Sequence, residues 1–336
     1  MNSKNHLQHK FKGLALLSGG LDSILAIKLI QEQNIEVEAV VFVSPFFNSV
    51  NAERAADYLK IKLHKIDITE KIIEILKNPK FGFGKNLNPC IDCHLLMIKE
   101  ASKLMKEIGA DFLITGEVVG ERPKSQNYNA LKIIEKESNL KGRILRPLSA
   151  KKLEPTIMEK EGIIDREKLL GITGRSRSIQ MELALKYNIK NYPTPAGGCL
   201  LTVPKFADRL RINLNIGKLD RNELEILKYG RHFIDNKNTK IIVGRNESEN
   251  FKILELADAF SFIFEIYEKP GPITILDNPE PDETQIINSA SLTARYSKYR
   301  NEEKVEVKFY RKNEPQKFNL IKVKPKNFDE LSLKLI

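Results

Sequence analysis

Residues 14–23 read LALLSGGLDS, and this stretch decides the fold that we expect for the chain. The apolar run 14–17 predicts a buried strand, and apolar residues at helical spacing after Ser23 predict a helix. Gly19 and Gly20 predict a tight turn between them, where the backbone can approach a ligand because no Cβ intervenes. An ordinary strand-turn-helix corner gives a similar pattern, but the complete SGGxDS string after an apolar run is more specific.

The predicted turn is suited to bind an anion. Unpaired backbone N–H groups at a helix start and in a glycine turn form a cradle for negative charge. Ser18, Asp22 and Ser23 lie in or beside this first helical turn. The string lacks the lysine of the GxxxxGK[ST] loop, so it suits the pyrophosphate of an ATP that is cleaved to AMP.

At these residues the chain resembles the PP-loop ATP pyrophosphatase superfamily, whose members adenylate a substrate and release pyrophosphate. The resemblance implies that ATP is a cofactor and that Mg²⁺ accompanies it, with Asp22 as a contributor to the cation site. It also implies that the loop residues bind the ATP phosphates: Ser18, Gly19, Gly20, Leu21, Asp22 and Ser23.

Composition indicates a globular protein with a polyanionic partner. The 336 residues are 41% hydrophobic and 29% charged, with a net charge of +11. No apolar run reaches the length of a membrane span. The polar start of the chain is not followed by a signal-peptide pattern, so we expect a cytoplasmic protein that does not engage a membrane. The positive charge favours nucleic acid, although a solvated lysine-rich surface would give the same total.

Alternating strand and helix patterns predict an α/β fold with a doubly wound parallel sheet. Strands are expected at 14–17, 37–43, 62–66 and 111–115, and helices at 51–59, 70–77, 94–108, 151–161, 166–170 and 178–188. Ligands of such sheets bind beyond the carboxyl ends of the strands. Ser44, Thr115 and Gly116 follow strand ends there, so one nucleotide could contact them together with the glycine turn.

The texture of the sequence changes near residue 215. Beyond it, short strands such as 240–243 and 272–276 alternate with helices near 249–260 and 282–296, and 305–310 with 318–323 predicts a hairpin. We therefore expect two domains, a PP-loop domain over 1–215 and a smaller α+β domain over 216–336.

The three cysteines are candidate site residues. Cys90 and Cys93 form a CxxC motif between a Gly/Asn/Pro-rich loop and a predicted helix, and Cys199 follows the Pro/Gly-rich loop 193–198. A helix start lowers the pKa of a thiol. The alternative for a cysteine is a small buried hydrophobe, which these positions disfavour. A closed zinc site would require a fourth ligand, for which His94 is poorly placed.

Two functional interpretations of the cysteines stay open. One cysteine could carry a persulfide sulfur that another resolves as a disulfide. Alternatively, all three could bind a [4Fe–4S] cluster with one iron left open for sulfide. We favour the cluster, because the chain has three cysteines and no spare one.

Two further strings extend the resemblance to tRNA 4-thiouridine synthetases. Residues 113–126 read LITGEVVGERPKSQ and residues 144–148 read ILRPL, similar to the TGE…GQ…SQ and LRPL segments of those enzymes. Glu121 and Arg122 replace part of the family's central Gly-Gln. The NPCxxC string resembles 2-thiouridine synthetases and iron–sulfur tRNA thiolases. The resemblance implies that Thr115 and Gly116 lie beside the nucleotide, that Gln126 supports the site, and that Asp22, Cys90, Cys93 and Cys199 are catalytic.

The C-terminal part resembles the NFACT-type RNA-binding domain. The similar strings lie at 229–233, 240–250, 271–274 and 294–297. Together they supply cations for phosphate and rings for stacking, although each residue alone is as well explained by a solvated face or a core. The candidates are Arg231, His232, Arg245, Arg295, Tyr296, Tyr299 and Arg300.

The sequence thus predicts an ATP-dependent tRNA thiolase that adenylates a uridine carbonyl oxygen and then transfers sulfur. Its expected partners are tRNA and a sulfur donor, either free sulfide or a carrier, and a homodimer is one candidate assembly. The alternatives are a persulfide-based 2-thiouridine synthetase, an RNA-binding module with a degenerate ATP site, and a PP-loop ligase or amidase acting on a small molecule. The residues do not distinguish a 4-thio from a 2-thio product, nor the position modified.

Overall fold

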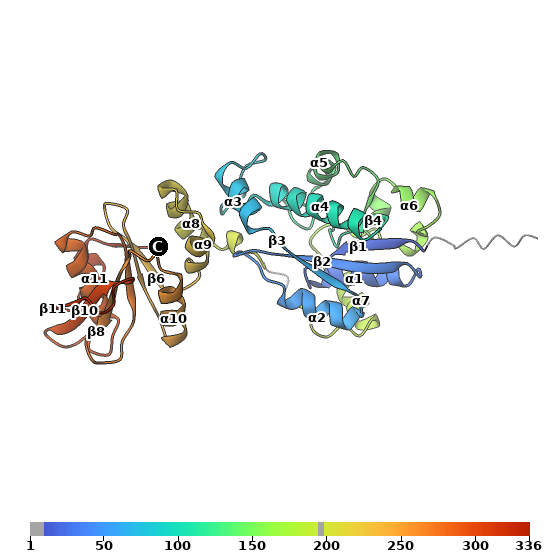
Figure 1. Ribbon diagram of the computed structural model, residues 1–336. Coiled ribbons are helices and arrows are strands. Elements are labelled where there is room, and N and C mark those ends of the chain that lie inside the picture. Colours follow the sequence, from blue (N-terminus) through green and yellow to red (C-terminus); the bar gives the residue numbers. More distant parts are fainter. Residues whose placement is uncertain (1–9, 194–197) are drawn as a thin grey trace, which may run out of the picture. The chain divides into compact units, whose positions relative to one another are not determined.

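The computed structural model describes residues 10–193 and 198–336. The chain forms two compact units, one up to Leu200 and one from Leu201 onward, called here unit 1 and unit 2. In Figure 1, unit 1 contains a parallel sheet flanked by helices, and unit 2 contains an antiparallel sheet.

Unit 1 is built on a five-stranded sheet in which every neighbouring pair is parallel. In spatial order the strands are β3 (Leu63–Asp67), β2 (Glu36–Val43), β1 (Lys12–Leu16), β4 (Phe112–Ile114) and β5 (Ile144–Leu145). The strand before the glycine turn, β1, is therefore central, and Ala15 pairs with both Ala39 and Ile114. Because β2, β1 and β4 are adjacent and parallel, the segments that follow them emerge at one edge of the sheet.

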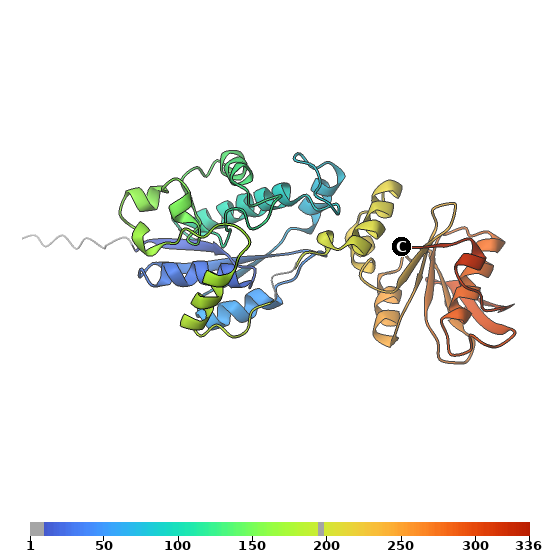
Figure 2. The same ribbon diagram turned by 180° about the vertical axis from the view of Figure 1, so that it is seen from behind.

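Helices cover both faces of this sheet (Figures 1 and 2). One face carries α1 (Leu21–Gln31), α2 (Val50–Leu59) and α7 (Ser178–Lys186), and the other carries α3 (Thr69–Lys77), α4 (Cys90–Glu107) and α5 (Tyr128–Ser138). The apolar side chains of α1 are buried in the core, with Leu25 and Ile27 fully inaccessible. The predicted α/β class with a doubly wound parallel sheet is confirmed.

The segment between β5 and α7 differs from the prediction. The expected helices over 151–161 and 166–170 are replaced by η1 (Ala150–Lys152), α6 (Ile157–Lys160) and η2 (Arg166–Lys168). Pro155 disfavours a helical residue before it, and Thr156 begins a new helix through a capping box with Glu159.

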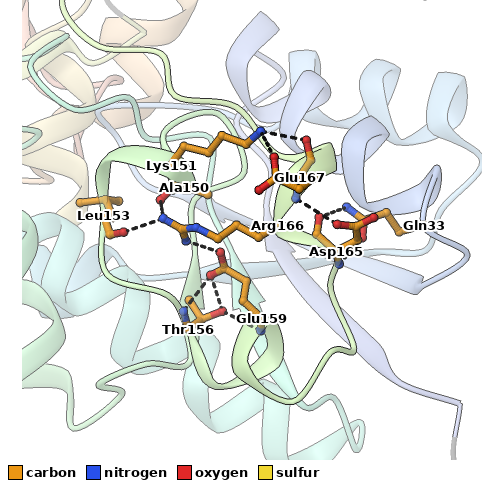
Figure 3. Close-up of polar contacts among 9 residues, drawn as sticks. All are labelled: Gln33, Ala150, Lys151, Leu153, Thr156, Glu159, Asp165, Arg166 and Glu167. Carbon is orange, nitrogen blue, oxygen red and sulfur yellow. Dashed lines mark hydrogen bonds and ion pairs between the residues drawn. The ribbon is translucent and has the colours of Figure 1, made fainter.

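Arg166 organises the irregular segment in place of a helix (Figure 3). Its guanidinium donates to the carbonyl oxygens of Ala150 (2.8 Å) and Leu153 (3.0 Å) and pairs with Glu159. Asp165 N donates to Gln33 Oε1 (2.7 Å), which ties the segment to the turn after α1. Side-chain bonds therefore fix a path that local propensity does not encode.

Unit 2 contains a seven-stranded sheet in which every paired neighbour is antiparallel. Its order is β11 (Phe318–Val323), β10 (Val305–Arg311), β8 (Phe262–Ile266), β9 (Thr274–Asp277), β7 (Lys240–Val243), β6 (Arg231–Ile234) and β12 (Lys334–Leu335). The short helix η3 (Leu200–Thr202) spans the chain boundary between the units, and the helical elements of unit 2 are α8 (Pro204–Ile216), α9 (Arg221–Ile226), α10 (Glu247–Leu256), α11 (Glu283–Arg295) and η4 (Asp329–Leu331).

Both faces of this sheet are packed. Ile241 and Phe264 lie in a core with Leu292 of α11, whereas their sequence neighbours Ile242 and Ile263 contribute to a second core with α9 and α10. This alternation follows the two-residue period of a strand. The predicted hairpin is present, since β10 and β11 pair directly.

The two units meet at Leu200–Leu201, earlier in the chain than the position near 215 expected from sequence texture. The difference is α8, which belongs to unit 2. Arg209 of α8 donates to the carbonyl oxygens of Leu227 (2.7 Å) and Gly230 (3.5 Å), and Asn213 is fully buried beside Glu223. The helix is amphipathic like those before it, so its sequence does not reveal which core it covers.

In the part of the chain that the structure describes, no helix combines the length and the apolar character needed to cross a membrane.

Candidate functional site

The glycine turn after β1 has a conformation that requires glycine. Gly19 has a φ of +77°, and a Cβ at this position would lie 2.2 Å from the carbonyl carbon of Asn51. Gly20 is the N-cap of α1, and its N–H lies 3.3 Å from Ser18 Oγ. Ser23 Oγ donates to the Gly20 carbonyl oxygen (2.8 Å), which closes the turn. The backbone of α2 thus packs directly against the turn.

The end of β4 packs against the first turn of α1. A Cβ on Gly116 would lie 2.5 Å from the backbone nitrogen of Ser23, so only glycine permits this approach. Thr115 is buried and donates to Glu117 Oε2 (3.1 Å). Residues almost a hundred positions apart in the sequence therefore form one surface.

A cavity of about 520 Å³ opens at this edge of the sheet. Of the predicted site residues, the structure brings the following to its lining: Ser18, Gly20, Leu21, Asp22, Ser23, Thr115, Gly116, Gln126 and Cys199. Gly19, Ser44, Cys90 and Cys93 lie outside the lining. Ser44 Oγ instead accepts a hydrogen bond from the backbone N–H of Phe46 (3.1 Å).

Asp22 and Gln126 present polar atoms that other described residues leave unused. Asp22 Oδ1 and Gln126 Oε1 are both buried without a hydrogen-bond partner in the described part of the chain. Burial raises the pKa of Asp22, and the nearby Arg177 opposes this shift. An unpartnered buried carboxylate oxygen is a suitable ligand for a hard cation such as Mg²⁺. The residues present therefore fit the cation that ATP requires.

A buried ion-pair network that sequence reasoning missed supports the cavity wall. Arg146, only 2% exposed, donates to Glu117 Oε2 (2.9 Å) and pairs with Glu135. Glu117 also contacts His94 Nδ1 (2.9 Å), and both of these residues line the cavity. Burial alone would raise the pKa of Glu117, but Arg146 and His94 hold it at about 2. An arginine within the apolar run 144–148 was the available signal, because a buried guanidinium needs acidic partners.

The structure moves the start of the helix that was expected over 94–108. Helix α4 starts at Cys90, so Cys90 and Cys93 occupy its first turn. The helix starts this early because the Pro89 carbonyl accepts a bond from the Cys93 N–H (2.9 Å). Cys90 Sγ accepts a hydrogen bond from Asn88 Nδ2 (3.0 Å).

The expected lowering of the thiol pKa at a helix start is wrong for Cys93. Its thiol is buried, and burial together with the nearby Cys199 and Cys90 raises its pKa. Desolvation outweighs the helix dipole there.

Among the described residues, no three His, Cys, Asp or Glu side chains converge on a point where one metal ion could bind. Most of the Pro/Gly-rich loop predicted over 193–198 before Cys199, residues 194–197, lies outside the described part of the chain.

In unit 2, some of the residues predicted to contact RNA are buried or paired with other side chains. His232 is 1% exposed and its ring lies 2.7 Å from the Tyr229 carbonyl oxygen, so it is a core residue. Burial lowers the pKa of His232. Arg245 pairs with Glu249 (2.7 Å). Arg231 stacks over Tyr296, with 4.6 Å between the guanidinium carbon and the ring centre.

Comparisons with known proteins agree with the division of the chain into two units. Residues 9–182 match the model of the thiamine biosynthesis protein (ThiI) family, and residues 230–334 match that of the NFACT protein RNA binding domain.

Individual relatives match part of the chain. The tRNA-specific 2-thiouridylase MnmA of Sulfurimonas denitrificans is 36% identical over 118 residues, which is 32% of this chain and 35% of that protein. A probable tRNA sulfurtransferase of Lysinibacillus sphaericus is 34% identical over 153 residues, 43% of this chain and 36% of the relative. The chain thus spans little more than a third of these relatives.

Among solved structures, a 4-thiouridine synthetase–RNA complex with bound ATP is 24% identical to this chain, with a TM-score of 0.35. The match covers 64% of this chain and 53% of that one. Since the ThiI model matches more than half of the 336 residues and includes the glycine turn, the chain belongs to the thiamine biosynthesis protein (ThiI) family.

Proposed function

We propose that this protein is an ATP-dependent tRNA thiolase that replaces a uridine carbonyl oxygen with sulfur. One observation carries the proposal: Cys199 lines the same 520 Å³ cavity as the glycine turn that begins α1. A thiol and an anion cradle in one cavity allow adenylation of the uridine and sulfur transfer to it to occur at adjacent positions. The names of the relatives, a 2-thiouridylase and a sulfurtransferase, support the same reaction class.

The reaction begins with adenylation. The uridine carbonyl oxygen attacks the α-phosphate of ATP, the bond to the β-phosphate breaks, and pyrophosphate leaves. The N–H groups of the glycine turn and of the first turn of α1 stabilise the negative charge of the phosphates. Asp22 would hold Mg²⁺ through its unpartnered Oδ1, and the cation would offset the charge of the leaving pyrophosphate.

Sulfur transfer follows at the activated carbon. A sulfur nucleophile forms the new carbon–sulfur bond, and AMP leaves with the former carbonyl oxygen. Cys199 would deliver or receive the sulfur because it lines the cavity, whereas Cys93 is buried and lies outside the lining. In a persulfide reaction, Cys93 would have a supporting role, because burial raises the pKa of its thiol and so disfavours the thiolate.

Two sulfur sources are compatible with three thiols. In the cluster route, Cys90, Cys93 and Cys199 would hold a [4Fe–4S] cluster, which when bound would offer an open iron for sulfide. A cubane is larger than a single ion, so its ligands do not have to converge on one point. In the persulfide route, a carrier of sulfane sulfur would load one cysteine as a persulfide, and its outer sulfur would pass to the uridine. The second cysteine would then form a disulfide with the first, which an external thiol reductant would have to reduce before the next turnover.

Iron analysis separates these routes. The protein would be purified anaerobically, and its absorption spectrum, iron and sulfide would be measured together with those of Cys90→Ala. A brown protein whose colour and iron are lost in the variant supports the cluster. An active, colourless and iron-free protein supports the persulfide.

We propose further that unit 2 binds the tRNA. Its match to an RNA-binding domain model supports this, as does the Arg231–Tyr296 stack, which combines a cation with a ring. The target uridine would have to leave its base stack to reach the cavity of unit 1.

The proposed function is tested by incubating the protein without oxygen with tRNA, ATP, Mg²⁺ and a sulfur donor, either sulfide or a low-molecular-weight persulfide with a thiol reductant. We expect thiouridine in the digested tRNA and release of pyrophosphate, with neither formed when ATP is omitted. Binding of tRNA without pyrophosphate release, with any tRNA and either sulfur donor, would contradict the proposal and indicate an RNA-binding module.

A further inference from the structure

Arg177 is a cavity residue that the sequence patterns did not single out. It is the N-cap of α7 and lines the cavity, with 14% of its side chain exposed. Two contacts bring the preceding segment to this place: Gly174 N donates to the Val119 carbonyl oxygen (2.8 Å), and α7 packs beside α1. Arg177 therefore lies next to the first turn of α1, although more than 150 residues separate the two in sequence.

The guanidinium of Arg177 has donors that the described residues do not use. Its Nη2 atom lies 3.5 Å from Asp22 Oδ2, which makes a loose ion pair. Its Nε is buried and has no hydrogen-bond partner in the described part of the chain. A buried donor without an acceptor costs free energy, so its retention at a cavity wall indicates an acceptor that the protein alone does not supply.

The other charged residues of the cavity lining indicate which kind of acceptor Arg177 would bind. Glu117 is already neutralised by Arg146, and Asp22 has one oxygen available for a cation. Burial raises the pKa of Asp22 and of Glu121, a third carboxyl group of the lining, and Arg122, an exposed residue that also lines the cavity, opposes both shifts. Two guanidinium groups beside a glycine turn and a helix start form a site for a multiply charged anion.

We propose that Arg177, assisted by Arg122, binds the phosphates that ATP has and AMP lacks, and so determines the preference of the cavity for the triphosphate. This inference rests on the proposed use of ATP. The two arginines supply the positive charge that the glycine turn lacks, because the SGGxDS string contains no lysine. The loose pair with Asp22 holds the guanidinium in place while its Nε–H remains available to a phosphate oxygen.

The test compares the affinity for ATP with that for AMP in the full-length protein, measured by calorimetry with Mg²⁺. Replacing Arg177 by Gln removes charge-assisted hydrogen bonds, so ATP binding should weaken about tenfold or more. Affinity for AMP should change by less than about threefold, because the lost contacts are to phosphates that AMP lacks. Arg177→Lys should recover part of the loss, since it restores the charge but not the fork geometry.

The matched control is Arg175→Gln, an exposed arginine two residues away that does not line the cavity. It should bind both nucleotides like the wild type. If Arg177→Gln does not melt cooperatively, Arg122→Gln is the deciding variant, because Arg122 is exposed and its replacement does not disturb the core. A loss of affinity for ATP but not for AMP in that variant supports the proposal. An unchanged affinity for ATP overturns it.

The outcomes separate this inference from the proposed function. A folded Arg177→Gln protein with wild-type affinity for ATP, or with equal losses for ATP and AMP, overturns the role of Arg177 alone. A wild-type protein that binds no ATP overturns the proposed function and this inference with it.

Discussion

Gly19 illustrates how a single residue is constrained both by its own backbone and by a distant element. Its φ of +77° disfavours any residue with a Cβ, and the backbone of Asn51 occupies the space where that Cβ would be. The first constraint is local and can be inferred from a glycine turn. The second arises only when α2 packs against the turn.

Gly19→Ala should therefore lose both stability and nucleotide binding. The left-handed conformation alone costs about 1–2 kcal/mol, and the clash with Asn51 adds to it by displacing the turn. Urea unfolding and nucleotide titration check this. The control is Gly162→Ala, where φ is +72° but the Cβ would meet nothing within 4 Å. A smaller stability loss is expected there, with nucleotide binding intact, and equal effects of the two changes would contradict the packing argument.

Cys199 is the thiol that lines the cavity, so its removal should separate the two half-reactions. Cys199→Ala should abolish thiouridine formation while ATP affinity stays within about twofold of the wild type, because the anion cradle is formed by other residues. Nucleoside mass spectrometry and calorimetry measure the two effects. Thiolation at the wild-type rate in this variant would disprove a role of Cys199 in sulfur transfer.

At the scale of elements, the network around Arg146 joins β5 to the segment after β4 and to α5. Arg146 follows β5, Glu117 follows β4, and Glu135 belongs to α5. His94 of α4 completes the network at the cavity. Ion pairs buried to this degree are strongly destabilising when one partner is removed, because the other charge is left without compensation.

Glu117→Gln should lower the free energy of unfolding by about 3 kcal/mol near neutral pH. The pKa of Glu117 in the folded protein is about 2, below its ordinary value of 4.5. Its stabilising contribution is therefore complete above pH 4.5 and is lost as the pH falls toward 2. Urea unfolding from pH 2.5 to 7 should show the wild type and the variant converging at the acid end.

An exposed carboxylate provides the control for this prediction. Glu182→Gln on α7 should not change the acid limb of the stability curve. A constant difference between wild type and Glu117→Gln across the whole pH range would show that the loss comes from packing and not from ionisation.

At the scale of the whole molecule, the two units have separate cores and different sheet types. Unit 2 includes α8, whose Phe206 and Leu210 are buried and whose Arg209 bonds to carbonyl oxygens after α9. A fragment that begins at the texture change near 215 would omit this helix and expose part of the core of unit 2.

A fragment of residues 201–336 should consequently unfold cooperatively, whereas 216–336 should be less stable by several kcal/mol because it loses two buried apolar side chains and the bonds of Arg209. Circular dichroism with urea measures both. Equal stabilities would place the boundary near 215 instead.

The sequence by itself determined the parallel sheet, the glycine turn at the end of its central strand, and the helices that flank it. These features follow from hydrophobic periodicity and from the backbone freedom of glycine, which act over a few residues. The same patterns located Thr115 and Gly116 at a strand end, because strand polarity is implied by the order of strands and helices.

Only the tertiary structure decided which side chains share the cavity and what protonation states burial gives them. Arg177 and Glu117 reach the wall through packing between segments far apart in the chain, and no periodic pattern records such neighbours. Burial reversed two expectations, because it raised the pKa of Cys93 at a helix start and made His232 a core residue. Desolvation depends on what covers a group in three dimensions, and that covering is set by the whole fold rather than by the residues beside it in sequence.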